Sequence, residues 1–197
     1  MAQFCHDPQR LDLGGDGRVL FVFSCDRDPG CANWDAFKGA TAVFVVEPGA
    51  LSTSPTPAPR DTPSLRREVI IARWVTRDDG VPTELAAAFY SDDAYLELDD
   101  NILDKVTACT RLGGLPAWAQ SAQDVPGPNW GFVGQIDIFH TFLTPPKAPP
   151  AWVEPWQGDE GFTHIGGFTE FGDGGMAYLF RESHRLTPHF VLFTQSH

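Results

Sequence analysis

Residues 171–180 read FGDGGMAYLF, and residues 15–23 read GDGRVLFVF. Each stretch has a Gly-Asp-Gly turn that leads into a short apolar run ending in phenylalanine. Further upstream, MAQF at residues 1–4 aligns with VGQI at residues 133–136. An internal repeat constrains architecture more strongly than local propensity does. The sequence therefore predicts two similar β-rich units that share one core.

The rest of the chain has the pattern of a single domain built from short strands. Its 197 residues are 42% hydrophobic, which is enough for a core without disulfides or metals. Gly134, inside a predicted strand, indicates a bulge or a close backbone approach. The predicted fold class is mainly β (α+β), with pseudo-repeat one at 1–48, a Pro-rich linker at 49–64, pseudo-repeat two at about 110–197, and one or two short helices. Strands are predicted at 18–25, 41–47, 66–77, 130–142, 176–180 and 189–195, and a helix at 82–90.

Charge and hydropathy exclude some classes of partner. The formal net charge is −12, so we expect no nucleic-acid binding, because a phosphate backbone requires a basic surface. No apolar run approaches the roughly 20 residues that span a bilayer. Residues 1–10 have neither a basic region nor an apolar region of the kind found in signal peptides. We therefore expect a cytoplasmic protein that does not bind membranes.

Three of the four cysteines and one histidine are candidate zinc ligands. They are Cys5, His6, Cys25 and Cys31, and zinc prefers four nitrogen or sulfur ligands in a tetrahedron. Cys5 and His6 are adjacent, so on a strand they face opposite ways and one of them at most is expected to bind. The alternative is that the cysteines pack as small buried side chains. A protein without a cofactor is favoured, and zinc is the cofactor that these spacings allow.

Three aspartates offer a possible carboxylate cluster for acid–base chemistry or metal binding. Asp16 and Asp173 each lie between glycines, where an aspartate usually stabilises a turn by accepting from nearby backbone N–H groups. Asp137 lies in a predicted strand, and we expect it to accept hydrogen bonds from the backbone of a turn, since a buried unpaired carboxylate is costly. The chain has no complete catalytic motif, and a nucleophilic Cys5 or Cys109 would need a base beside it.

Several tryptophans lie in Gly- and Pro-rich stretches rather than in strand patterns. Trp118 follows Leu-Gly-Gly-Leu-Pro-Ala and is predicted to be exposed. Trp152 and Trp156 lie in APPAWVEPWQGDE at residues 148–160. Packing in the core is the usual role of tryptophan, but loop tryptophans on a β scaffold also make binding hot spots.

Four stretches resemble the YwqG-like family of bacterial proteins. They are TRLGGLPAWAQ at 110–120, GQID at 134–137, FGDGGMAYLF at 171–180 and HFVLFTQSH at 189–197. That family is similar to the eukaryotic programmed-cell-death-2 family, whose members escort a ribosomal protein. Residues 19–34 resemble a stretch of the escort family, with Cys25, Cys31 and Trp34 at matching places. The Cys-x-x-Cys knuckle that precedes the glutamine strand in the escort family is missing here, which weakens the zinc inference.

The expected function is that of a non-enzymatic binding module. The missing catalytic motif, the loop tryptophans and the resemblance to an escort family favour a protein or peptide partner and an escort or neutralising role. The alternative is a small hydrolase or another enzyme that uses a carboxylate or a Cys/His site. The residues predicted to bind a partner are Trp118, Gln135, Asp137, Trp152, Trp156 and Asp173.

Overall fold

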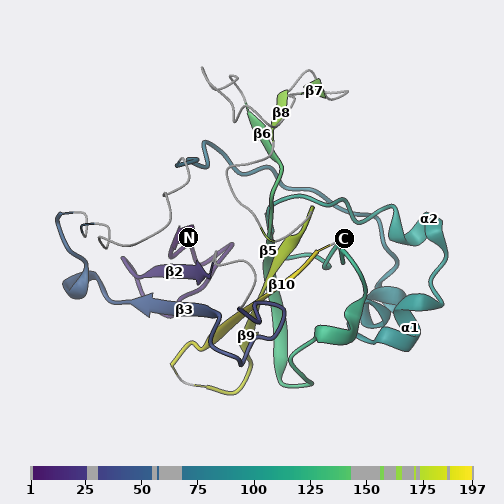
Figure 1. Ribbon diagram of the computed structural model, residues 1–197, viewed down its shortest axis with the longest axis horizontal. Helices are drawn as coiled ribbons and strands as arrows, with labels where there is room; N and C mark the ends of the chain where they lie inside the picture. Colours follow the sequence, from purple (N-terminus) through teal and green to yellow (C-terminus); the bar gives the residue numbers. More distant parts are fainter. Residues whose placement is uncertain are drawn as a thin grey trace.

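The computed structural model describes most of the chain. Described are residues 2–25, 31–54, 57, 68–142, 156–157, 163–165, 171, 174–185 and 187–196. Figure 1 shows three groups of strands, with short helices on one side of the central group. The fold is mainly β, as the sequence predicts. In the described part of the chain, no helix has both the length and the apolar character needed to cross a membrane.

The first sheet is an antiparallel meander near the N-terminus. It consists of β1 (Ala2–Cys5), β2 (Val19–Ser24) and β3 (Thr41–Val46), in the order β1-β2-β3. The predicted strands at 18–25 and 41–47 are therefore confirmed. Valine and phenylalanine favour strands because their side chains suit a pleated surface that is buried on one face.

The second sheet has four antiparallel strands. They are β4 (Arg111–Leu112), β5 (Trp130–Asp137), β9 (Met176–Glu182) and β10 (Phe190–Gln195), in the order β10-β9-β5-β4. The register of β5 against β9 shifts between Phe132 and Gly134, so the predicted bulge is confirmed. A Cβ at Gly134 would lie 2.4 Å from the carbonyl oxygen of Arg111, which explains the glycine.

Strands β5, β9 and β10 form a second meander with the register of the first. Gln3 of β1 pairs with Phe21, and Gln135 of β5 pairs with Tyr178. Phe21 in turn pairs with Phe44, as Tyr178 pairs with Phe193. All the other β1–β2 and β2–β3 pairs have counterparts at the same offsets. Two residues before its second strand, each meander has a glycine with positive φ, Gly17 at 74° and Gly174 at 70°.

The two meanders pack against each other and share one core. Leu20 and Val22 of β2 lie in the same buried cluster as Ala177 and Leu179 of β9. The meanders also meet edge to edge, where the Thr41 hydroxyl of β3 donates to the carbonyl oxygen of Leu192 in β10 at 2.6 Å. Figure 1 shows β2 and β3 on one side of β9 and β10, and the helices on the other.

Short helices and loops cover the other face of the second sheet. The predicted helix at 82–90 is a 3₁₀ helix, η2 (Thr83–Tyr90), and a second buried cluster joins residues from this region to β9 and β10. The remaining helices in the described part of the chain are η1 (Pro48–Ala50), α1 (Asp92–Leu96), α2 (Asp100–Leu103) and η3 (Ala122–Asp124).

A small third sheet follows β5. It consists of β6 (His140–Phe142), β7 (Trp156–Gln157) and β8 (Thr163–Ile165), in the order β6-β8-β7. The strand predicted at 130–142 is therefore divided into β5 and β6. The division follows Asp137, whose carboxylate accepts a hydrogen bond from the backbone N–H of Phe139 at 3.1 Å.

The strand predicted at 66–77 is not present in the described residues of that range, 68–77. Ile70 is 79% exposed and Val75 is 74% exposed, so this segment packs little of its apolar surface. Its β-branched residues favour a strand only where a neighbouring strand and a core face are available. The segment is instead fixed just downstream of this range, where the carboxylate of Asp79 lies 2.6 Å from the guanidinium of Arg111.

Candidate functional site

Trp118 is the centre of the cluster that covers the second sheet. Its ring centroid lies 4.5 Å from that of Tyr178, and its indole N–H donates to the carbonyl oxygen of Phe89 at 2.7 Å. The ring also lies nearly parallel to those of Phe180 and Phe193. The prediction that Trp118 is exposed is wrong, because its side chain is only 8% exposed. The Gly- and Pro-rich turn folds across the sheet instead of projecting from it.

Buried polar side chains hold the backbone of residues 117–121 against this sheet. The Gln135 amide accepts from the N–H of Ala117 at 2.9 Å and donates to the carbonyl of Cys109 at 3.0 Å. The Tyr178 hydroxyl accepts from Ala119 and donates to the Ala117 carbonyl. Gln195 accepts from Gln120 and donates to the carbonyl of Ser121. The predicted site residue Gln135 thus anchors this segment from within.

Asp137 has the role that the sequence predicts for it. Its carboxylate accepts from the Phe139 N–H, and its own N–H donates to the Thr110 hydroxyl at 3.0 Å. Burial raises the pKa of the Asp137 carboxyl above its ordinary value of 3.8, and hydrogen bonds from the Phe139 and Ile138 backbone oppose that rise. Asp16 is exposed in the first turn. Asp173 lies outside the described residues.

A cavity of about 680 Å³ lies between Asp137 and the turn that carries Trp118. Phe89, Tyr95, Leu103 and Met176 supply much of its apolar wall, and Arg77, Asp104, Cys109 and Asp137 supply titratable groups. Among the hydrogen bonds between described residues, none joins the side chains of any two of these four titratable groups. This arrangement provides a binding volume lined by apolar and titratable side chains.

The first sheet has an equivalent face that none of the described segments covers in the same way. We call it the open face and define it by Gln3, Phe21, Phe23, Ala42, Phe44 and Val46. Phe44 is 55% exposed and Phe23 is 39% exposed, with their ring centroids 6.0 Å apart. Phe21 stacks beside Phe23 at 6.5 Å. Single exposed apolar residues are common, but a contiguous aromatic patch marks a candidate interaction surface.

Because the two meanders have the same strand register, each residue of the open face occupies a position equivalent to one on the face under Trp118. Gln3 corresponds to Gln135, and Phe21 corresponds to Tyr178. Phe44 corresponds to Phe193, and Val46 corresponds to Gln195. Sequence reasoning missed the open face, although MAQF and VGQI were aligned, because alignment alone does not show which face of a strand is covered.

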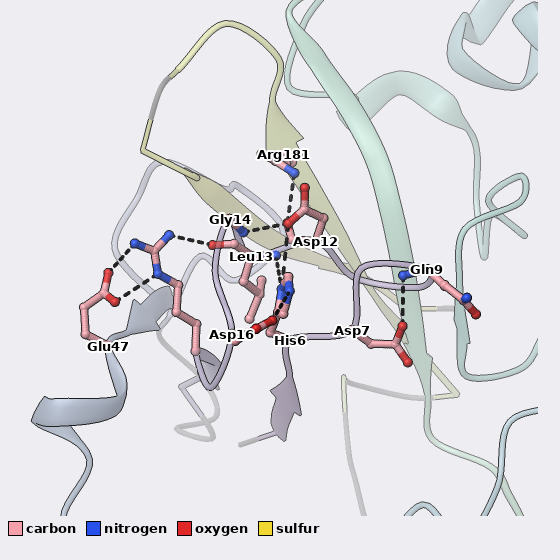
Figure 2. A network of polar contacts seen from close by, with 10 residues as sticks. His6, Asp7, Gln9, Asp12, Leu13, Gly14, Asp16, Glu47 and Arg181 are labelled. Atoms are coloured by element: carbon pink, nitrogen blue, oxygen red, sulfur yellow. Dashed lines mark hydrogen bonds and ion pairs between the residues drawn. The ribbon is translucent and has the colours of Figure 1, made fainter.

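His6 organises the loop between β1 and β2. Figure 2 shows its ring pointing towards Leu13, Asp12 and Asp16. The Nδ1 atom accepts from the Leu13 N–H at 3.0 Å, and Nε2 lies 3.6 Å from Asp16. Nearby, Arg18 binds the Glu47 carboxylate and donates to the Leu13 carbonyl. The role of His6 is therefore to hold this loop.

The four predicted zinc ligands do not come together. Cys25 and Cys31 are close, with sulfur atoms 2.7 Å apart. Cys5 pairs with Val19 at the opposite end of β2, roughly 20 Å from Cys25 at a rise of about 3.3 Å per residue. His6 is engaged in the β1–β2 loop. In the described parts of the chain, no three or more His, Cys, Asp or Glu side chains are grouped to hold a metal ion.

Trp152 and Trp156 are the two remaining residues that the sequence predicts to bind a partner. Trp152 lies outside the described residues, and the structure describes only the backbone of Trp156, which pairs with His164 in the third sheet. Both stay predictions.

Comparison of the chain with protein-family models, with curated proteins and with solved structures found no match. The resemblance to the YwqG-like family therefore rests on the sequence stretches alone.

Proposed function

We propose that this protein is a non-enzymatic module that binds a partner protein or peptide through the open face. The observation that carries the proposal is the exposure of an aromatic patch on the first meander, at positions whose counterparts in the second sheet are covered by chain. Aromatic side chains on a fixed scaffold contribute much of the energy of protein interfaces. The resemblance to an escort family agrees with a role in escorting or neutralising a protein.

The charge of the chain supports a protein partner over a nucleic acid. The formal net charge is −12, and nucleic-acid binding depends on basic side chains that neutralise phosphates. The side chains that define the open face are all uncharged. Such a face suits a partner surface that is itself apolar and aromatic.

Affinity capture with matched variants tests the proposal. The Phe23→Ser/Phe44→Ser double variant removes the patch, and Leu96→Ser is the control, because Leu96 is 68% exposed on α1. Proteins from the native host should co-purify with the wild type and with the control but not with the double variant, at equal thermal stability. Retention of the same proteins by the double variant would contradict the proposal.

An enzyme is the second candidate function, and the cavity favours it. A carboxyl with a raised pKa in a cavity is a feature of many acid–base catalysts, and Asp137 has both properties. Turnover of ester, amide or phosphoester substrates that Asp137→Asn abolishes without unfolding would support this candidate. Equal rates for the wild type and the variant would exclude Asp137 as the catalytic acid or base.

A further inference from the structure

We infer that Cys25 and Cys31 form a redox-active pair, which low-molecular-weight disulfides of the glutathione class convert reversibly into an intramolecular disulfide. The pair is a modification site in the connection between β2 and β3. Its chemistry does not depend on which partner the protein binds. The backbone contacts of the two cysteines, the distance between their sulfur atoms and their accessibility all support this site.

Backbone hydrogen bonds fix the position of each cysteine. Cys25 directly follows β2, and its N–H donates to the carbonyl oxygen of Ala40 at 2.8 Å, just before β3 begins. On the other side of the connection, Asn33 lies two residues after Cys31. The carbonyl oxygen of Asn33 accepts from the N–H of Thr194 in β10 at 2.8 Å. The first cysteine is therefore anchored to the first sheet, and the second is anchored close to the second sheet.

These two anchors are also joined to each other. The Thr41 hydroxyl of β3 donates to the carbonyl oxygen of Leu192 in β10 at 2.6 Å. A continuous set of contacts between described residues thus connects Cys25 to Cys31 without passing through residues 26–30. Two groups that the surrounding structure already holds side by side react with each other at a high effective concentration.

The distance between the two sulfur atoms suits a disulfide. The Sγ atom of Cys25 lies 2.7 Å from that of Cys31. A disulfide bond is about 2.05 Å long, so the sulfur atoms need to approach by less than about 1 Å. A zinc ion would hold two thiolates about 3.8 Å apart at tetrahedral angles, which is wider than the observed separation. The contact therefore fits a disulfide better than a metal site.

The other two cysteines of the chain lie away from this pair. Cys5 pairs with Val19 at the opposite end of β2. The carbonyl of Cys109 accepts from Gln135 of β5, which is two strands away from β10 in the second sheet. Both cysteines of the pair are half-buried, so a small reagent has access to them. Each member of the pair therefore has the other as its nearest thiol.

Oxidation of the pair is a thiol–disulfide exchange in two steps. The thiolate of one cysteine attacks a sulfur atom of oxidised glutathione, forms a mixed disulfide and releases one glutathione thiolate. The thiolate of the other cysteine then attacks the protein sulfur of the mixed disulfide and releases the second glutathione. The cysteine pair loses two electrons, which oxidised glutathione gains, and two protons pass from the cysteines to the two glutathione thiolates. Excess reduced glutathione reverses both steps.

Non-reducing peptide mapping of the full chain tests this site. The protein is equilibrated with mixtures of reduced and oxidised glutathione, quenched in acid, alkylated and digested with trypsin. Trypsin cleaves after Arg27, so the disulfide joins two peptides, residues 19–27 and residues 28–38, that otherwise separate. Mass spectrometry should find this joined pair at least about tenfold more often than any disulfide that includes Cys5 or Cys109, because neighbouring thiols react at a high effective concentration.

A single substitution separates the two steps of the exchange. Cys31→Ser leaves Cys25 able to form the mixed disulfide but removes the thiol that resolves it. Glutathione should therefore accumulate on Cys25, and the joined peptides should disappear. Cys5→Ser is the matched control, and it should leave the yield of joined peptides unchanged, because Cys5 lies at the opposite end of β2.

Two results would overturn the inference. One is that the two peptides of the wild type stay unjoined in oxidised glutathione, because the cysteines would then not react with each other. The other is about one equivalent of zinc in the purified protein that alkylation of Cys25 and Cys31 releases, because the two cysteines would then be metal ligands. Either result leaves the proposed function of the open face standing, since none of these measurements involves a partner.

Discussion

The two meanders have the same strand order and register, but the described residues cover the second meander on both faces and the first on only one. In the second sheet, Trp118 and its neighbours bury Tyr178 and Phe193 completely. In the first sheet, the ring at the position of Phe193 is Phe44, which is 55% exposed. The comparison teaches that register decides which side chains share a face, whereas the chain that crosses the face decides whether it is core or surface.

The outer faces of the two meanders also differ in their polar side chains. Where chain is fixed on the sheet, Tyr178 and Gln195 satisfy its backbone groups. Where the sheet is open, the equivalent positions are Phe21 and Val46, which have no polar side-chain atoms. A permanent internal contact buries many backbone groups and must pair them, because an unpaired buried group costs about 1–3 kcal/mol.

The largest expected effect comes from removing the ring that covers the second sheet. Trp118→Ala should lower the free energy of unfolding by about 4 kcal/mol, because it empties a packed site and frees the Phe89 carbonyl. Phe44→Ala, the matched change on the open face, should change it by less than about 1 kcal/mol. Urea denaturation of both variants measures this difference. Equal losses would mean that the first sheet is covered as well.

A second expected difference concerns Gln135 and Gln3, which occupy equivalent positions in the two meanders. Gln135→Leu should cost about 2 kcal/mol, because it leaves the Ala117 N–H and the Cys109 carbonyl without their partner. Gln3→Leu should stay within about 0.5 kcal/mol of the wild type, since Gln3 is exposed. Chemical denaturation checks both. A cost at Gln3 as large as that at Gln135 would contradict the proposed asymmetry of the two faces.

The junction between the meanders gives a third test. Thr41→Val keeps the shape of the side chain but removes the hydroxyl that donates to Leu192, so the protein should lose about 1 kcal/mol of stability. Thr41→Ser keeps the hydroxyl and is the control. If thermal unfolding shows the same loss for both variants, the methyl group rather than the hydrogen bond joins the two sheets.

The smallest effect is the pH dependence that Asp137 of the second meander adds to stability. The folded protein holds the pKa of Asp137 above 3.8, its ordinary value, so the folded state binds its proton more tightly than the unfolded state. The contribution of Asp137 to stability should therefore fall as the pH rises from about 3.8 through the raised pKa, and then stay constant. Asp137→Asn removes this dependence while retaining an acceptor for Phe139.

Denaturation of the wild type and Asp137→Asn from pH 3.5 to pH 7 measures the effect. The variant should gain relative to the wild type as the pH rises. Parallel pH profiles for the two proteins would show that Asp137 titrates at its ordinary pKa in the folded state.

Most of the strands could be predicted from the sequence. The points where strands end, and the strand-like segment that forms no strand, could not. The runs around Val22 and Leu179 alternate or cluster in ways that favour strands. The segment around Ile70 has a similar composition but forms no strand in its described residues, because no described strand pairs with it. The break between β5 and β6 depends on the contact of Asp137 with Phe139, which periodicity does not reveal.

The residues of the candidate sites could likewise be predicted only in part. The sequence identified Gln135, Asp137 and Trp118 as noteworthy, and predicted correctly that Asp137 would accept from a turn backbone. It predicted the wrong exposure for Trp118, because a Gly- and Pro-rich stretch has the same composition whether it projects into solvent or folds onto a sheet. It grouped Cys5 with Cys25 as possible ligands, although β2 separates them.

By itself, the sequence determined that the chain is rich in β structure, that two stretches share a Gly-Asp-Gly turn and a following strand, and that the net charge is −12. These properties depend on local propensity and composition, which act within a few residues. Only the tertiary structure decided that residues 116–121 cover one meander and leave the open face on the other. Covering depends on contacts between segments far apart in the chain, and no local pattern records which of two equivalent faces such a segment will occupy.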